Sequence, residues 1–211
     1  LNKSLRDGLT ELDRDLAHQK RDGQELQREV LGMRLVAFDG VSDRLYAVVR
    51  QAAKHAGCSV RLDIKGSDTE VDRSMLERLA PCLEHLVRNA VMHGIETSSE
   101  RLALGKLPTG EISIAVQQLG QHIHIDVRDD GAGLRKDRIR SKAIAQGLLA
   151  HDADLSDEDA IALLTRTGFS TSDDVNMFAG RGVGMDVVRR SIQALGGRIS
   201  ISSQPGKGSA F

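Results

Sequence analysis

The stretch HLVRNAVMHGIE, residues 85–96, places polar side chains at a regular interval within an apolar segment. His85, Asn89 and His93 recur every four residues, so on a helix they would form one polar stripe. The amide oxygen of Asn89 suits Mg²⁺, which prefers oxygen ligands and keeps waters and phosphates in its shell. The two imidazoles could orient a phosphate or a water, or offset its charge. Zinc fits poorly, because it takes nitrogen, sulfur or carboxylate ligands. The stripe alone leaves open a helix edge whose polar groups are solvated or bonded to the backbone.

The composition narrows the class of protein. The 211 residues suffice for one domain with a core and some further structure. Charged residues make up 28% with a formal net charge of -1, which argues against a mainly electrostatic nucleic-acid or membrane surface. Aromatic residues are only 2% and there is no Trp, so base-stacking platforms are disfavoured. We therefore expect neither nucleic-acid binding nor membrane insertion.

Cysteine usage and the chain ends indicate the setting. Cys58 and Cys82 have no metal-ligand spacing, which favours a reducing, cytoplasmic environment. No apolar run is long enough to span a bilayer, and no signal peptide is visible. The chain begins at Leu1 rather than Met and ends at Phe211 in a strand-like stretch. We interpret it as a fragment of a longer protein.

Residues 1–36 carry a heptad-like apolar stripe, which weakens where Gln19 and Gly23 occupy the seam. The stripe consists of Leu5, Leu9, Leu12, Leu16, Leu26, Val30 and Met33. A long helix with such a seam usually needs a partner, so we predict a dimerisation helix or one arm of a helical hairpin. The alternative is an amphipathic helix that packs on its own domain.

The remaining sequence mixes helical and strand patterns. Helices are predicted over 41–57 with a C-cap at Gly57, over 72–93 with a kink or break at Pro81, and over 135–147, 156–164 and 184–197. Strands are predicted over 59–66, 111–118, 122–130 and 198–204, with a hairpin at Gly120 and a turn over 205–209. This mixture predicts an α+β fold, a two-layer sandwich of a mixed β-sheet with helices on one face.

The segment DVRDDGAGL, residues 126–134, places a carboxylate at the end of a strand. Asp129 could accept a hydrogen bond from the exocyclic amine of adenine, whereas guanine presents a carbonyl at that position. Asp129 is thus a candidate for selecting ATP over GTP. Gly131 and Gly133 allow the backbone to turn tightly after it. The alternative is an ordinary Asp–Gly turn.

Two further segments are candidates for binding a ligand: one is rich in glycine, and the other lies in the long loop before it. GRGVGMDVV, residues 180–188, sets glycines directly before a helix start, where backbone N–H groups can bind an anion. It lacks the Lys-Ser/Thr of a P-loop and is not preceded by a strand of a βαβ unit. GFST, residues 168–171, lies in the long loop before it, and we interpret the loop as a lid with Phe169 as its apolar anchor. A disordered surface loop is the alternative.

The order of these segments is more specific than any one of them. NxxxH, DDGAG, GFST, GRGVGM and GKGS resemble, in that order, the N, G1, F, G2 and G3 boxes of the ATP-binding domain of histidine kinases in the GHKL superfamily. The sequences HLVRNAVMHGIE and GRGVGMDVV are most similar to those of the CheA-type chemotaxis kinases. The resemblance covers about residues 38–211. It implies a mixed sheet backed by three main helices, with ATP between helices and lid, and it makes residues 1–37 part of a dimerisation helix and linker.

The resemblance also implies roles for individual residues. Asn89 would ligate Mg²⁺, His85 would lie near the γ-phosphate and assist its transfer, and His93 would contact phosphate. Asp129 would bind the adenine amine, backed by Ser209. The other residues implied to bind the nucleotide are Gly131, Gly133 and Gly208 in the pocket wall, Phe169 and Thr171 in the lid, and Gly180, Gly182 and Gly184 at its hinge. Met92 departs from the family, because many members have Asp there.

The implied activity is that of a protein-histidine kinase with ATP and Mg²⁺ as cofactors. The γ-phosphoryl group would pass to a His on a separate phosphotransfer domain and from there to a response regulator. A coupling protein and a chemoreceptor would act through a regulatory domain that we expect beyond Phe211, and residues 1–36 would form a homodimer. The alternative function is a nucleotide-responsive dimer scaffold that binds ATP without transferring its phosphate.

Overall fold

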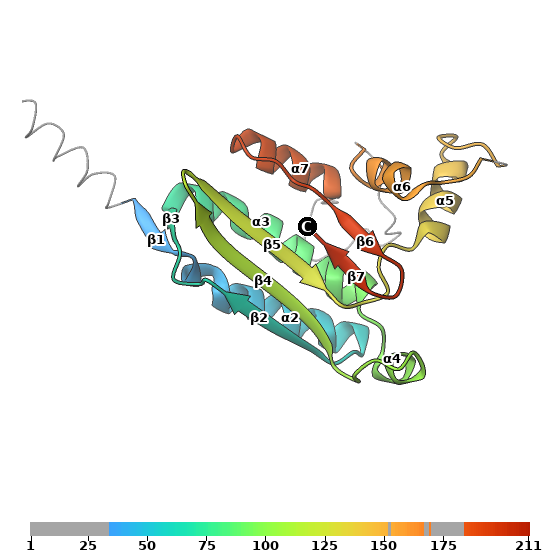
Figure 1. Ribbon diagram of the computed structural model, residues 1–211, viewed down its shortest axis with the longest axis horizontal. Coiled ribbons are helices and arrows are strands. Elements are labelled where there is room, and N and C mark those ends of the chain that lie inside the picture. Colours follow the sequence, from blue (N-terminus) through green and yellow to red (C-terminus); the bar gives the residue numbers. More distant parts are fainter. Residues whose placement is uncertain (1–33, 152, 167–168, 170–183) are drawn as a thin grey trace, which may run out of the picture.

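The computed structural model describes residues 34–151, 153–166, 169 and 184–211. Figure 1 shows two layers, a mixed β-sheet and a helical layer of α2 (Ser42–Ala56), α3 (Arg73–Asn89) and α7 (Met185–Ala194) on one of its faces. The predicted two-layer α+β class is confirmed. Most of the predicted N-terminal helix lies outside the described residues. Its end is wrong, because Leu35–Ala37 form a strand, β1.

The main sheet has five strands in the order β2-β4-β5-β7-β6. Its strands are β2 (Val60–Lys65), β4 (Gly110–Leu119), β5 (His122–Asp129), β6 (Ser202–Gln204) and β7 (Gly208–Ala210). β2 is parallel to β4 and the other pairs are antiparallel, which makes the sheet mixed. β6 is shorter than the strand predicted over 198–204. A separate antiparallel pair joins β1 to β3 (Glu70–Asp72) ahead of α3.

The β4–β5 hairpin forms where the alternating pattern predicts it. Ile112, Ile114 and Val116 point into the core and are almost fully buried, as expected for a strand with one covered face. Gly120 closes the turn with φ of 64°, a conformation that glycine adopts without steric cost. Because β5 continues to Asp129, the hairpin delivers that carboxylate to one end of the sheet.

Helix α3 passes through Pro81 without a break, so of the predicted kink or break the break is wrong and the kink stays a prediction. Proline removes one helical hydrogen bond and costs about 3 kcal/mol in a helix interior. The helix forms because its apolar stripe is buried against α2 and the sheet, and burial of a large aliphatic side chain contributes about 1.5–3 kcal/mol. The buried residues of α3 are Leu76, Leu79, Ala80, Cys82, Leu83, Leu86 and Val87.

A π-helical turn, η2 (Ala90–Gly94), continues α3, and the sequence pattern did not reveal it. The Ile95 N–H bonds to the Ala90 carbonyl at 2.8 Å, one residue further along than in an α-helix. The turn therefore changes the direction in which His93 projects relative to an unbroken helical stripe. His85 and Asn89 stay on regular helix, whereas His93 is carried by the turn.

Smaller elements complete the fold. They are a 3₁₀ turn η1 (Phe38–Val41), α4 (Ser98–Ala103), α5 (Lys136–Ala145) and α6 (Asp157–Leu164). α4 was not predicted, although Thr97 and Glu100 form a capping box at its start. α5 and α6 pack around a second apolar cluster, separate from the main core, that includes Ile139 and Phe169.

Pro81→Ala is expected to raise the free energy of unfolding by about 1–3 kcal/mol. Pro81 is exposed, so the change loses little packing, while the new N–H can bond to the preceding turn of α3. Urea unfolding measures the difference. Gln51→Ala, at an exposed site in α2, is the matched control and should stay within about 0.5 kcal/mol of the parent. Destabilisation by Pro81→Ala would show that the core requires the proline's local geometry.

Candidate functional site

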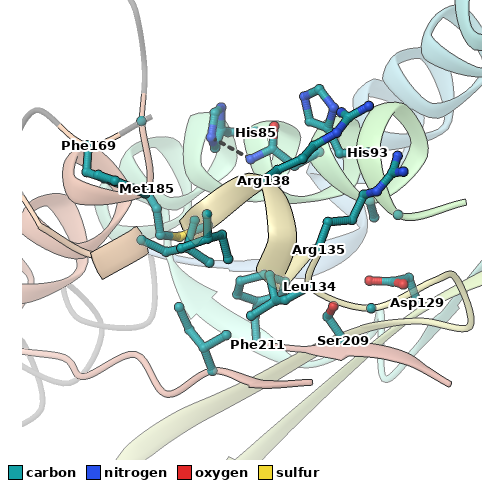
Figure 2. Close-up of a pocket in the computed structure, with 18 residues that line it drawn as sticks. His85, His93, Asp129, Leu134, Arg135, Arg138, Phe169, Met185, Ser209 and Phe211 are labelled. Carbon is teal, nitrogen blue, oxygen red and sulfur yellow. Dashed lines mark hydrogen bonds between the residues drawn. The ribbon is translucent and has the colours of Figure 1, made fainter. Parts of the chain in front are cut away.

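One pocket gathers most of the described residues to which the sequence assigns a nucleotide role. His85, Asn89 and His93 line one wall from α3 and η2, and Asp129 and Ser209 line the opposite end from β5 and β7. Figure 2 shows His93 and Asp129 on the same side of the cavity, with the His85–Asn89 pair further along the helix. The candidate site therefore lies between the helical layer and the ends of the central strands.

His85 and Asn89 are bonded to each other, with 2.8 Å between the His85 Nε2 and Asn89 Nδ2 atoms. Burial lowers the pKa of His85, and the nearby Arg88 and His93 lower it further, so the ring is neutral at pH 7. A neutral ring whose Nε2 accepts a bond from the Asn89 NH₂ group carries its proton on Nδ1. In that arrangement the Asn89 amide oxygen lies outside the bond and is available to a cation.

Two arginines that the sequence analysis did not assign share the pocket with His93. Arg135 and Arg138 line it from the start of α5. Figure 2 shows both side chains extending across the cavity toward His93. The readable signal was the basic run RKDR directly after the DDGAGL turn. Together these groups make one end of the pocket cationic, as an anion requires.

Asp129 lines the pocket from the sheet, across from α3 and η2, and is only 9% exposed. Burial raises the pKa of its carboxyl group to about 6, while hydrogen bonds from the backbone of Gly131 and Ser209 lower it and the charges of Asp130 and Glu96 raise it. The Gly131 N–H donates to the Asp129 Oδ1 at 3.0 Å. At pH 7 the group is mainly an ionised, poorly hydrated acceptor, which suits a single directed hydrogen bond to a ligand.

Ser209 and Gly208 hold Asp129 through the main chain. Ser209 contributes its backbone to the carboxylate, while its hydroxyl lies 3.2 Å from that of Ser203. A Cβ on Gly208 would come within 1.9 Å of the Asp129 carbonyl oxygen, and the φ of Gly208 is +101°. Only glycine permits this approach of β7 to the end of β5.

The remaining glycines that were assigned to the pocket lie at close backbone approaches. A Cβ on Gly131 would meet the Gly94 carbonyl oxygen at 2.2 Å, and one on Gly133 would meet the Gln204 carbonyl oxygen at 2.5 Å. Gly184 lines the pocket and is the N-cap of α7. Gly131 thus lets the turn after β5 lie directly on η2.

Apolar side chains line a further part of the pocket. They come from elements distant in sequence and are Leu134, Ile139, Leu164, Phe169, Met185, Ile201 and Phe211. Of these, Phe169 was singled out in the sequence, as a lid anchor. Phe169 packs in the cluster between α5 and α6. Such a surface suits a flat apolar group that ends in a polar edge facing Asp129.

Three predicted nucleotide-binding residues, Thr171, Gly180 and Gly182, lie outside the described residues. Asp186, in the first turn of α7, bonds to Arg190 one turn later, at 2.9 Å. Among the residues that the structure describes, no group of three or more His, Cys, Asp or Glu side chains could hold a metal ion. A cation here would accordingly rely on Asn89 together with oxygens of its ligand.

The described part of the chain contains no helix that is both long and apolar enough to cross a membrane.

Comparison with known proteins places this geometry in a family. Residues 76–211 match the family model of the histidine kinase-, DNA gyrase B- and HSP90-like ATPases. The chemotaxis protein CheA of Rhizobium meliloti (strain 1021) is 45% identical over 97% of this chain and 27% of its own length. The gliding motility regulatory protein of Myxococcus xanthus is 42% identical over 97% of this chain and 26% of its own length. The chain thus spans less than a third of these relatives.

A solved structure shares the fold. The catalytic domain of the histidine kinase ThkA, in a nucleotide-free form, matches with a TM-score of 0.51 at 16% identity, covering 84% of this chain and 90% of that chain. At this identity the likeness concerns the fold alone. The family match includes the turn and strands around Asp129 as well as the second half of α3 with His85 and Asn89. On this match, the chain belongs to the family of histidine kinase-, DNA gyrase B- and HSP90-like ATPases.

Proposed function

We propose that residues 38–211 are the ATP-binding core of a chemotaxis-type sensor histidine kinase, which passes the γ-phosphoryl group of ATP to a His on a separate phosphotransfer domain. The observation that carries the proposal is the polarity of the pocket. One cavity combines a buried carboxylate acceptor, a group of apolar side chains, and an amide, imidazoles and two arginines. Adenine and triphosphate together require these same three kinds of contact. The similarity to chemotaxis proteins supports the same assignment.

At the base end, the Asp129 carboxylate accepts a hydrogen bond from the adenine amine. Its two backbone donors, from Gly131 and Ser209, fix its orientation. Guanine presents a carbonyl oxygen there, and two acceptors facing each other in a poorly hydrated site repel. The buried, oriented carboxylate thereby selects ATP over GTP.

At the phosphate end, Asn89 offers an amide oxygen and Arg135, Arg138 and His93 offer positive charge or N–H donors. The residues fit a Mg²⁺ ion, because the bond to His85 orients the Asn89 amide with its oxygen outside that bond. Bound Mg²⁺ would neutralise charge on the phosphate oxygens. His85 is neutral and bonded to Asn89, so its first role is to orient that amide.

Phosphoryl transfer needs little covalent help from the protein, so catalysis rests on position and charge. Arg135 and Arg138 hold the phosphates in line with an incoming imidazole and stabilise charge in the transition state. The acceptor His is supplied by the phosphotransfer domain, which then passes the group to a response regulator. A coupling protein and a chemoreceptor would act through a regulatory domain of the full protein. Residues 1–37 would supply the dimerisation helix and its linker. The cytoplasmic setting indicated by the cysteines stays a prediction.

Asn89→Ala is expected to abolish the strengthening of ATP binding by Mg²⁺ and, with it, phosphoryl transfer, because it removes the amide oxygen that the described residues place at the phosphate end. Calorimetry with Mg²⁺ and with EDTA measures binding, and labelled ATP with a supplied phosphotransfer domain measures transfer. Gln117→Ala, at an exposed site on β4, is the control. Unchanged transfer in Asn89→Ala would remove Asn89 from the mechanism. Binding without any transfer in the parent would favour the scaffold alternative.

Asp129→Asn is expected to weaken ATP binding by about 1–3 kcal/mol, the usual cost of a spoiled hydrogen bond to a charged group. The preference for ATP over GTP should shrink as well, because the amide offers a donor to the guanine carbonyl. Competition titrations with both nucleotides measure this. Asp126→Asn, on the same strand and paired with Arg128, is the matched control and should bind ATP like the parent. Parent-like affinity in Asp129→Asn would refute the adenine role.

The same substitution is expected to stabilise the unliganded protein. The pKa of Asp129 is raised from 3.8 to about 6 in the folded state, so its ionisation opposes folding by an amount that grows between these two pH values, is full above about pH 6 and disappears below the unfolded value. Asp129→Asn should therefore gain about 2–3 kcal/mol near pH 7.5 and about half of that near pH 5. Urea unfolding at both pH values measures it, and Asp126→Asn should show no such gain. A pH-independent effect would contradict the burial argument.

A further inference from the structure

An ionic cluster lies behind the base end of the pocket, largely buried except at Asp130, whose side chain is 45% exposed. Arg101 of α4 is only 1% exposed, and Lys106, which follows α4, has a side chain that is 18% exposed. Their partners are Glu96, two residues after η2, and Asp130, directly after β5. The cluster has two cations and two anions, drawn from three separate segments of the chain. We call these four residues the ionic clamp.

Lys106 donates to three acceptors that belong to two segments of the chain. Its Nζ atom lies 2.7 Å from the Glu96 Oε1, 2.8 Å from the Asp130 carbonyl oxygen and 2.8 Å from the Gly131 carbonyl oxygen. Through these three bonds, Lys106 holds the backbone of the turn after β5 against the segment that follows η2. Two of its three bonds are to main-chain oxygens, so the clamp acts on the path of the chain as well as on charge.

Arg101 completes the connection. Its Nη2 donates to the Asp130 Oδ2 at 2.6 Å, and its Nη1 donates to the Asp130 Oδ1 and the Glu96 Oε2, both at 3.1 Å. A lysine at this position could not make the same forked contacts, because only the guanidinium group presents several donors in one plane. The Glu111 N–H also donates to Asp130, at 2.9 Å, and so joins the clamp to β4.

The segments that the clamp joins are those that shape the base end of the pocket. The Ala132 N–H donates to the Gly94 carbonyl oxygen at 2.8 Å, directly beside the bond from Gly131 to Asp129. A small separation of η2 from this turn would break that bond and change where the Asp129 carboxylate points. Buried ion pairs contribute little net stability compared with apolar packing, so the main consequence of this clamp is geometric.

We propose that Arg101 and Lys106 are positioning residues for adenine recognition: through Glu96, Asp130 and the Gly131 carbonyl, they hold the turn that carries Asp129 in register with η2. The proposal rests on the proposed ATP-binding function. It adds a set of residues that touch neither base nor phosphate and yet fix the affinity for the base. Loss of the clamp raises KM for ATP, while kcat at saturating ATP stays close to the parent, because the phosphate end does not depend on it.

The charges of the clamp predict a change in the pH dependence of nucleotide binding. Loss of rigidity in the turn would not produce the same change. The charged or titratable groups around Asp129 are Glu96, Arg101, Lys106 and Asp130 behind it, and Arg135 and His93 on the pocket side. Both anions of the clamp raise the pKa of Asp129. A cation paired with them opposes that effect by its charge, because a nearby positive charge favours the ionised carboxylate. Protonation of Asp129 at low pH weakens nucleotide binding, and we call this fall in affinity the acid limb. Removing one cation moves the acid limb to higher pH. A merely loosened turn admits water to Asp129 and moves the limb to lower pH.

The test uses the whole chain with Lys106→Met. Methionine is similar in length to lysine but has no charge, and Lys106 is the less buried of the two cations. ADP affinity is measured by calorimetry from pH 5 to 8, and transfer to a supplied phosphotransfer domain gives KM and kcat for ATP. We expect affinity at pH 7.5 to fall about tenfold, the acid limb to move to higher pH, and KM to rise with little change in kcat. Arg61→Met, which removes the exposed Arg61–Glu111 pair, is the matched control and should behave like the parent.

The double variant Glu96→Gln with Lys106→Met removes one anion and one cation together. It is expected to bind ADP less tightly than the parent but with the parent's acid limb, and it stands in for Lys106→Met if that variant does not fold. Parent-like ADP affinity in both variants would overturn the inference and leave the proposed function intact. A limb that moves to lower pH in Lys106→Met would also overturn it. Absence of ADP and ATP binding in the parent would overturn the proposed function itself.

Discussion

The pocket depends on keeping one carboxylate, that of Asp129, nearly free of water. Burying a carboxylate opposes its ionisation, and here that cost is lowered by two backbone N–H groups that face it. Those donors reach it only because Gly131 and Gly208 have no side chains to keep the neighbouring backbone away. The glycines of this region thus serve the carboxylate, and the arrangement of β5, β7 and η2 follows from their close contact.

The other end of the pocket is set by α3, a helix whose position is decided by its buried side. Its apolar stripe packs against α2 and the sheet strongly enough to carry Pro81 in the interior. The polar side with His85 and Asn89 is consequently held at a fixed distance from the strands. The π-helical turn then projects His93 toward Arg135 and Arg138 instead of continuing the stripe. One helix therefore contributes both the proposed metal ligand and a side chain that faces the two arginines.

Features encoded by neighbouring residues could be predicted from the sequence, whereas features created by tertiary contact could not. The β4–β5 hairpin and the end of α2 follow from alternation and from Gly120 and Gly57. The site residues around Asn89 and Asp129 were identified because their spacing and order resemble a known set of motifs. The break at Pro81 was wrongly predicted because local helix preference gives no measure of how much apolar surface the fold buries. The apolar walls and the ionic clamp come from segments far apart in the chain, and local sequence patterns do not predict such long-range contacts.

The two ends of the pocket differ in the groups that form them, and this difference would affect the proposed phosphoryl transfer. The base end consists of main chain and short side chains in contact with one another, which leaves little freedom to adjust. The phosphate end consists largely of long arginine side chains that cross the cavity from α5. A rigid base site fixes where the nucleotide sits, while long cationic side chains can follow the phosphate charge as it spreads during transfer. In the proposed kinase, an external histidine would then approach a phosphate whose position is already determined by the recognition of adenine at Asp129.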